Sequence, residues 1–144
     1  MAETPAPKAA PPAQQASPSV YVSNDLAKQC TLHMDNTQQA PKFDYDATSL
    51  EPADRDVLQA IAQCVTSGPL KGRRLELTGR ADPRGTEEYN MGLGSRRAGT
   101  VRDFLQHLGV NHGQLAQTTR GSLDANGADE NGWKQDRRVD ITLQ

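Results

Sequence analysis

Residues 79–98 read GRADPRGTEEYNMGLGSRRA and combine turn-forming residues with a helix start. Asp82, Pro83 and Gly85 are typical of a tight turn, because Pro presets its own backbone angle and Gly tolerates positive φ. Thr86 precedes two glutamates, a pattern that predicts a helix N-terminus with a capping hydroxyl. The stretch therefore predicts a turn that leads directly into a helix.

Two glycines interrupt the helical pattern after the turn. Gly92 and Gly94 each cost about 1 kcal/mol relative to Ala inside a helix. We therefore expect a short helix near 86–91, a bend, and a long helix near 95–108 that ends at Gly109. The buried face of the long helix is expected to consist of Ala98, Val101, Phe104, Leu105 and Leu108.

Alternating apolar and polar residues predict strands on both sides of this stretch. The expected strands are 42–46, 74–78, 139–143 and, with a weaker pattern, 115–121. A helix is expected to open at Glu51-Pro52 and to be ended by Gly68-Pro69, and 122–136 is expected to be a polar loop. The resulting β-α-β-α-β-β order predicts an α/β (α+β) two-layer sandwich, in which helices cover one face of a mixed four-stranded sheet.

The composition separates a tail from a folded domain. Residues 1–19 contain five of the nine prolines, six alanines and no larger aliphatic residue, so we expect a disordered linker there and a folded domain over 20–144. The net charge of −2, without a basic block, argues against nucleic-acid binding. The chain has no apolar run long enough to cross a membrane, and its first residues do not resemble a signal peptide. We therefore expect membrane contact only through an anchor outside this sequence.

The two cysteines, Cys30 and Cys64, allow two interpretations. In an oxidising compartment a disulfide between them closes a loop of more than thirty residues, which stabilises a fold by about 3–4 kcal/mol. Two buried thiols are the alternative. Two cysteines alone make no zinc site, and the scattered histidines follow no metal-binding spacing.

A candidate binding site lies around the turn. Asp82 follows the expected strand 74–78 closely, at the edge where open α/β sheets bind ligands. If the helix bends at Gly92–Gly94, Arg97 falls in the first turn of the long helix, where the helix dipole favours anions. A carboxylate and a guanidinium together match a zwitterion, and Asn90 lies between them in sequence. The alternatives are a turn aspartate that bonds only its local backbone and a solvated arginine face.

The run 79–98 also resembles the signature of the OmpA-like C-terminal domain, a family that includes peptidoglycan-associated lipoproteins and the stator protein MotB. The family pattern is G-x-T-D-x-x-G-x-x-x-Y-N-x-x-L-S-x-x-R-A. The residues that match in register are Gly79, Asp82, Gly85, Tyr89, Asn90, Leu93, Arg97 and Ala98. The segments Phe43-Asp44-Tyr45-Asp46 and Asp136-Arg137-Arg138-Val139-Asp140-Ile141 resemble two further family strands. The departures are Ala81 for Thr, Arg80 for an aromatic residue or His, Gly94 for Ser and Asp136 for Asn.

The resemblance implies non-covalent binding of peptidoglycan through the diaminopimelate of its peptide stem. It assigns the ligand ammonium to Asp82 and the ligand carboxylate to Arg97, with Asn90 in the pocket and Arg138 near the same site. It also implies a periplasmic location, associated with the outer membrane, in which the domain anchors that membrane or an envelope complex to the cell wall. Other envelope proteins are additional partners that this interpretation allows.

Two rival interpretations remain. The first is an envelope protein-interaction module of the same fold that does not bind the wall. The second is an enzyme acting on the wall, but we find no catalytic constellation and therefore expect no enzymatic activity and no cofactor. Trp133 in the polar loop is either a lid or the plug of a small apolar cluster, and the plug is favoured because large aromatic residues are usually buried.

Overall fold

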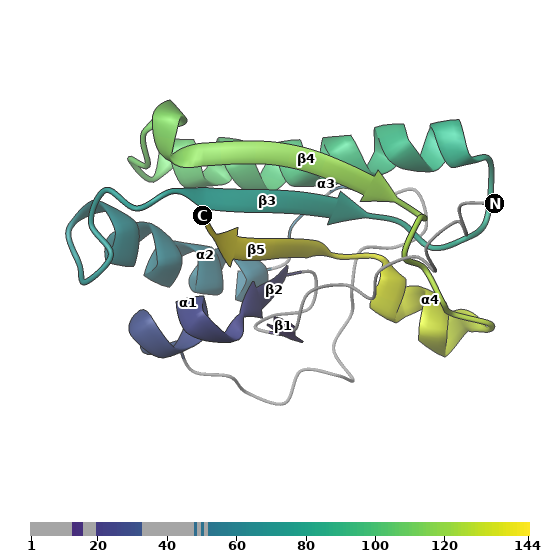
Figure 1. Cartoon of the computed structure of the whole chain (residues 1–144), viewed down its shortest axis with the longest axis horizontal. Helices are drawn as coiled ribbons and strands as arrows, with labels where there is room; N and C mark the ends of the chain where they lie inside the picture. The colour runs from purple at the N-terminus through teal and green to yellow at the C-terminus, as the bar shows by residue number, and fades with distance from the viewer. Residues whose placement is uncertain (1–12, 16–19, 33–47, 49, 51) are drawn as a thin grey trace, which may run out of the picture.

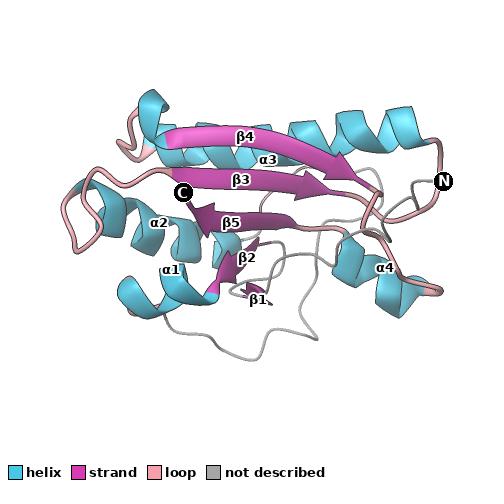
Figure 2. Ribbon diagram, in the orientation of Figure 1, coloured by secondary structure: helices cyan, strands magenta, loops and turns pink. Residues whose placement is uncertain are grey.

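The computed structural model describes residues 13–15, 20–32, 48, 50 and 52–144 of the chain. Five strands form one mixed sheet in the order β1-β2-β5-β3-β4 (Figure 2). The strands are β1 (Ala13–Gln15), β2 (Val20–Ser23), β3 (Leu75–Arg80), β4 (Leu115–Gly121) and β5 (Val139–Leu143). Strand β3 is parallel to β4 and antiparallel to β5, and β2 is parallel to β5.

The predicted fold class, helices on a mixed sheet, is confirmed, although the sheet of the described residues has five strands where four were predicted. The predicted strands at 74–78, 115–121 and 139–143 are also confirmed. The predicted strand at 42–46 lies outside the described residues. Strand β1 belongs to the stretch 1–19, which was predicted to be a linker, and it pairs antiparallel with β2. The linker prediction for the rest of that stretch stays a prediction.

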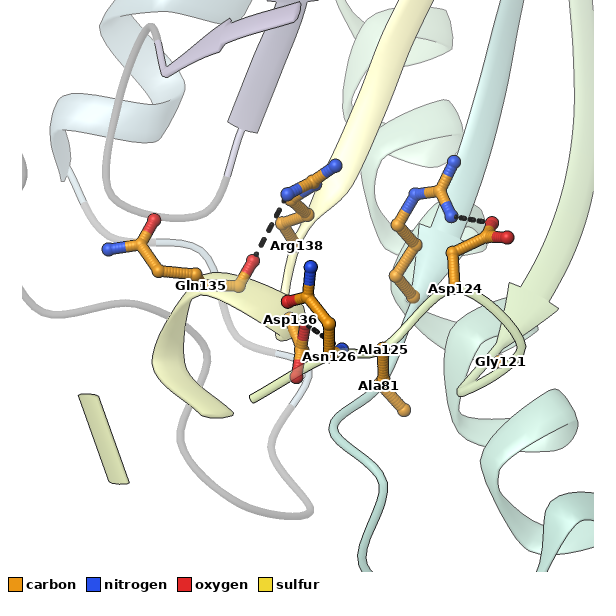
Figure 3. A pocket seen from close by; sticks show the side chains of 9 residues that line it. Ala81, Gly121, Asp124, Ala125, Asn126, Gln135, Asp136 and Arg138 are labelled. Carbon is orange, nitrogen blue, oxygen red and sulfur yellow. Dashed lines mark hydrogen bonds and ion pairs between the residues drawn. The ribbon is translucent and has the colours of Figure 1, made fainter. Parts of the chain in front are cut away.

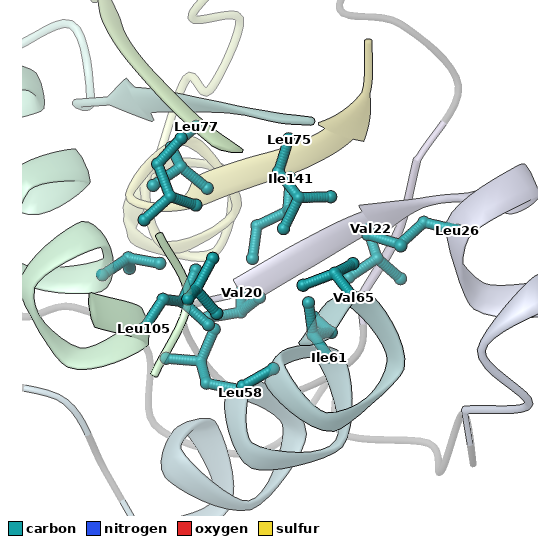
Figure 4. Close-up of a cluster of buried hydrophobic side chains, with 14 of the residues drawn as sticks. Val20, Val22, Leu26, Leu58, Ile61, Val65, Leu75, Leu77, Leu105 and Ile141 are labelled. Atoms are coloured by element: carbon teal, nitrogen blue, oxygen red, sulfur yellow. The ribbon is translucent and has the colours of Figure 1, made fainter. Parts of the chain in front are cut away.

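Helices α2 (Pro52–Thr66) and α3 (Glu87–His107) pack side by side behind the sheet (Figure 1). The short helices α1 (Asn24–Gln29) and α4 (Glu130–Asp136) lie at the sides of this layer. Leu58, Ile61 and Val65 of α2 are fully buried against the sheet (Figure 4). The burial of each such side chain contributes about 1.5–3 kcal/mol, which explains why the three-four apolar spacing of α2 correctly predicted this helix.

Helix α3 is continuous, so the predicted bend at Gly92–Gly94 is wrong. The reason is a close crossing with β3. A Cβ on Gly94 would lie 2.4 Å from Thr119 Oγ1 and 2.7 Å from the carbonyl oxygen of Gly79, and a Cβ on Gly79 would lie 1.6 Å from the carbonyl oxygen of Gly94. Gly94 therefore allows the helix to approach the sheet, and this packing offsets its low helix propensity.

The predicted helix start at Thr86 is confirmed, because its hydroxyl accepts a hydrogen bond from Tyr89 N at 3.1 Å. The helix ends at His107, and Gly109 follows with φ of 100°, as expected of a residue just past a helix C-terminus.

A disulfide joins Cys30, just after α1, to Cys64 on α2, with a sequence separation of 34. It joins the segment formed by β2 and α1 to helix α2. Of the two interpretations of the cysteines, the structure contains the disulfide.

The two helical glycines should respond oppositely to alanine. Gly94→Ala should lower the unfolding free energy by about 1–3 kcal/mol, because the added Cβ collides with backbone that cannot move freely. Gly92→Ala is the matched control, since its Cβ would meet only the flexible end of Arg96 at 3.4 Å, and it should stabilise the protein by up to about 1 kcal/mol. Urea unfolding of both variants measures the difference, and equal stabilities would contradict the close-crossing argument.

The disulfide should contribute about 3–4 kcal/mol to stability through the loop that it closes. We expect dithiothreitol to lower the urea midpoint of the parent and to leave the midpoint of the Cys30→Ala/Cys64→Ala double variant unchanged. A parent insensitive to reduction, with thiol titration confirming that both sulfurs are free, would refute this contribution.

Candidate functional site

Asp82 lies just beyond the C-terminal end of β3, beside both β4 and β5. The backbone continues the sheet up to this point, because Ala81 N donates to the carbonyl oxygen of Gly121 at 2.9 Å. The Asp82 side chain is buried. Asp82 therefore lies at the C-terminal edge of β3, as predicted.

Two arginines surround the Asp82 carboxylate. Arg84 donates from its backbone N at 3.0 Å, from Nε at 3.1 Å and from Nη2 at 2.7 Å. Arg137 donates from Nη1 to Oδ2 at 2.9 Å. The bond from Arg84 N is the local turn bond expected of a turn aspartate, but the guanidinium groups add an ionic site to it.

These contacts keep Asp82 ionised. Burial of the carboxyl group raises its pKa, but the hydrogen bonds from Arg84 and Arg137 together lower it by more, so the pKa of Asp82 lies below its ordinary value. At neutral pH the group is a carboxylate that can accept hydrogen bonds but donate none.

Arg97 is fully buried, so the alternative of a solvated arginine face is wrong for this residue. Because α3 does not bend, Arg97 lies in the middle of the helix. The prediction that Arg97 occupies a first helical turn, where the helix dipole favours anions, is therefore also wrong. Its Nη1 donates to the carbonyl oxygen of Arg80 at 2.9 Å, at the end of β3. The side chain thus spans from α3 to the end of β3.

Asn90 ties the turn to the first part of α3. Its Nδ2 lies 3.2 Å from the carbonyl oxygen of Asp82, 2.9 Å from that of Arg84 and 3.2 Å from Ser122 Oγ. Its side chain is almost completely buried. Asn90 therefore positions the backbone that carries Asp82.

One narrow cavity brings three of the four predicted ligand-binding residues together. As the side chains stand, it is too narrow to hold a water molecule. Its lining consists of Ala81, Asp82, Arg84, Tyr89, Asn90, Leu93 and Arg97. The cavity thus combines an anionic group, two cationic groups and an apolar wall.

Arg138 faces a second cleft, of about 120 Å³, on the other side of Ala81 (Figure 3). Its Nε donates to Asp140 Oδ1 at 2.9 Å, and its guanidinium lies 4.5 Å from the centre of the Tyr21 ring. Arg137, and not Arg138, contacts Asp82, because successive side chains of an extended segment point in opposite directions. The sequence analysis missed Arg137, although it lies next to Arg138 in the closing motif.

Helix α4 covers the Asp82 side of the site, so the prediction of a polar loop over 122–136 is wrong for 130–136. Asp129 caps this helix by accepting from Gly132 N at 3.0 Å. The ring of Trp133 stacks on the Arg84 guanidinium, 4.2 Å from ring centre to Cζ, while its Nε1 donates to the carbonyl oxygen of Gly127 at 3.1 Å. Trp133 therefore packs over the site residue Arg84 and is not part of the buried core.

Glu130, at the start of α4, completes the charges around the site. Its Oε1 lies 2.8 Å from Arg137 Nη2, and its Oε2 lies 3.9 Å from Arg84 Nη2. Arg137 lowers the pKa of Glu130, which is consistent with this pairing.

In the second cleft, Asp124 forms ion pairs with Arg80 and with Arg120, the latter at 2.9 Å. Its side chain is only 6% exposed. The hydrogen bonds from Arg120, and with them the one from Arg80, lower the pKa of Asp124 to about 2, against the opposing effect of burial. Asp136 lines the same cleft, and burial raises its pKa despite hydrogen bonds from the backbone of Gly127 and Asn126.

The described part of the chain holds no cluster of three or more His, Cys, Asp or Glu side chains placed to bind a metal ion. None of its helices has the length and apolar character needed to cross a bilayer. Asp44 and Asp46, in the segment that resembles a family strand, lie outside the described residues.

The Asp124 ion pairs should make stability pH-dependent. A folded-state pKa of about 2, below the ordinary 3.8, gives stability that is present above about pH 4 and is lost as the pH falls toward 2. Asp124→Asn should therefore be less stable than the parent by about 2 kcal/mol at pH 6, and this gap should narrow by about 1 kcal/mol at pH 3. Urea titrations at both pH values, with the exposed Asp103→Asn as the control, test this. A gap that stays constant with pH would contradict the assignment.

Known proteins of one family are similar to this chain in sequence. The profile of the OmpA family matches residues 42–139. The chain is 40% identical to a peptidoglycan-associated lipoprotein of Pseudomonas putida and to one of Pseudomonas aeruginosa, over 69% of its length in each case. It spans 59% and 58% of those two relatives.

Solved structures agree with this assignment. The crystal structure of the peptidoglycan-associated lipoprotein from Burkholderia pseudomallei is 39% identical and superposes with a TM-score of 0.66, covering 71% of this chain and 86% of that one. The C-terminal domain of Helicobacter pylori MotB, at 21% identity, superposes with a TM-score of 0.60 over 68% of this chain and 77% of its own, which shows a shared fold. From the match of the family profile and the identity to these relatives, we conclude that this chain belongs to the OmpA family.

Proposed function

We propose that this chain binds peptidoglycan non-covalently and holds the diaminopimelate of the peptide stem between Asp82 and Arg97. The observation that carries the proposal is the single cavity that both residues line, although they are far apart along α3 and the turn. A diaminopimelate side chain ends in one carbon that bears both an ammonium and a carboxylate. An ionised acceptor and a guanidinium donor in one cavity are complementary to such a zwitterion.

Asp82, Arg97 and Asn90 have different roles in the proposed binding. Asp82 accepts from the ligand ammonium, and Arg97 donates to the ligand carboxylate from the guanidinium that also donates to the carbonyl oxygen of Arg80. Asn90 holds the turn in place through its contacts with the carbonyl oxygens of Asp82 and Arg84. No covalent chemistry is required, so we propose binding without turnover.

The relatives support the same function. Their name, peptidoglycan-associated lipoprotein, describes association with the wall, and the matched region includes the site residues. We infer that this chain acts in the periplasm as part of an outer-membrane-associated anchor. Contacts at many stem peptides along one polymer raise the total strength of such an anchor, even when each contact is weak.

The expected test is a titration of the purified protein with a diaminopimelate-containing stem peptide and with the same peptide carrying lysine instead. The lysine peptide keeps the ammonium but lacks the carboxylate for Arg97, so it should bind at least about tenfold more weakly. Asp82→Asn and Arg97→Lys should each weaken binding of the diaminopimelate peptide by about tenfold or more. Arg96→Ala, which changes the neighbouring arginine, is the matched control and should bind as the parent does.

Thermal unfolding confirms that each variant is folded before its affinity is compared. A folded parent that binds neither the peptide nor purified wall would overturn the proposal and favour the protein-interaction module. Equal affinities for the diaminopimelate and lysine peptides would contradict the proposed contact between Arg97 and the ligand carboxylate.

A further inference from the structure

Arg84 covers the ionised group on which the proposed function depends. Its side chain gives Asp82 two hydrogen bonds, one to each carboxylate oxygen, from Nε at 3.1 Å and from Nη2 at 2.7 Å. It also lines the same cavity as Asp82 and Arg97. A ligand ammonium that approaches Asp82 therefore meets a guanidinium already bound in its place.

Of the two arginines on Asp82, only Arg84 is accessible. The Arg84 side chain is 32% exposed, whereas that of Arg137 is 4% exposed. Moving Arg137 would leave a buried charge without its partner, which is strongly unfavourable. Arg84 can move into solvent at much lower cost, while its backbone N continues to donate to Asp82 and keeps the turn intact.

Two residues of α4 define where Arg84 can go and how its movement can be seen. Glu130 Oε2 lies only 3.9 Å from Arg84 Nη2, so a second carboxylate is available next to the first. Trp133 stacks on the Arg84 guanidinium and is the only tryptophan in the chain. The hydrogen bond from Trp133 Nε1 to Gly127 fixes the ring independently of Arg84.

We propose that Arg84 is a displaceable cover of the site and sets its specificity for cations: a ligand ammonium replaces its guanidinium on Asp82, and Arg84 moves toward Glu130. The inference rests on the proposed function and adds a residue and a sequence of contacts to it. Binding is then an exchange of one charge-assisted pair for another. A ligand without a cationic group offers Asp82 no replacement for Arg84, so it leaves the cover in place.

The experiment measures affinity and Trp133 fluorescence together, with the diaminopimelate-containing stem peptide as the probe. Arg84→Ala should bind the peptide about three- to tenfold more tightly than the parent, because no internal cation competes for Asp82. Arg84→Gln, which keeps most of the side-chain length without the charge, should behave similarly if Arg84→Ala proves unstable. Arg96→Ala is the matched control, because Arg96 also lies over an aromatic ring, that of Tyr89 at 5.9 Å, and should leave the affinity unchanged.

Fluorescence gives a second readout that a purely structural role would not move. Saturating peptide should change the Trp133 emission of the parent, because Arg84 leaves the ring, and the same peptide should produce little change in Arg84→Ala. Calorimetry measures the affinities independently of the fluorophore.

The possible results distinguish failure of the Arg84 proposal from failure of the proposed function. Equal or weaker binding by the Arg84 variants, or peptide binding to the parent without a change in Trp133 emission, overturns the cover and leaves the proposed function standing. Tighter binding by the Arg84 variants than by a parent that itself binds, together with a change in Trp133 emission in the parent alone, supports the cover. Absence of binding in the parent and in both folded variants overturns the proposed function, and the cover with it.

Discussion

The close contact between Gly79 of β3 and Gly94 of α3 determines how the helix crosses the sheet, and the geometry of the site depends on that crossing. With no side chain at either position, the backbones approach closely. Arg97 lies about one helical turn after Gly94 and therefore reaches the carbonyl oxygen of Arg80 at the end of the strand. Asn90 lies about one turn before Gly94 and reaches the carbonyl oxygens of the following turn. One packing constraint thus places both residues relative to Asp82.

Charge balance around Asp82 is the second constraint. A buried carboxylate without partners costs several kcal/mol, so the fold surrounds it with arginine donors. Those donors come from the turn itself, through Arg84, and from the segment before β5, through Arg137. Under the proposed function, any cation that binds Asp82 enters a site that is already electrostatically satisfied. The net free energy of each binding event is then small, which suits an anchor that gains its strength from many contacts along one polymer.

Periodic patterns predicted the elements whose side chains face a single large core. The apolar spacing of 52–65 and the alternation of 139–143 correspond to α2 and β5, because burial against that core selects the pattern. The bend at Gly92–Gly94 and the polar loop over 130–136 were wrong for a common reason. Gly94 is present to make room for a strand distant in sequence, and α4 is held by its Asp129 cap and by polar contacts to the site. Neither the close crossing at Gly94 nor the polar contacts of α4 produce a periodic pattern of apolar residues in the sequence.

The amino-acid sequence alone specifies the chemical groups of the candidate site: a turn carboxylate at Asp82, an amide at Asn90 and a guanidinium at Arg97, in the order typical of one family. Local spacing carries this information because the turn and the helix start involve only neighbouring residues. Only the tertiary structure decided that Arg137, 55 residues away, contacts Asp82 while Arg138 faces a second cleft. It also decided that Trp133 of α4 stacks on Arg84. Such contacts depend on how β3, β5 and α4 meet at one end of the sheet, and no pattern among neighbouring residues specifies that meeting.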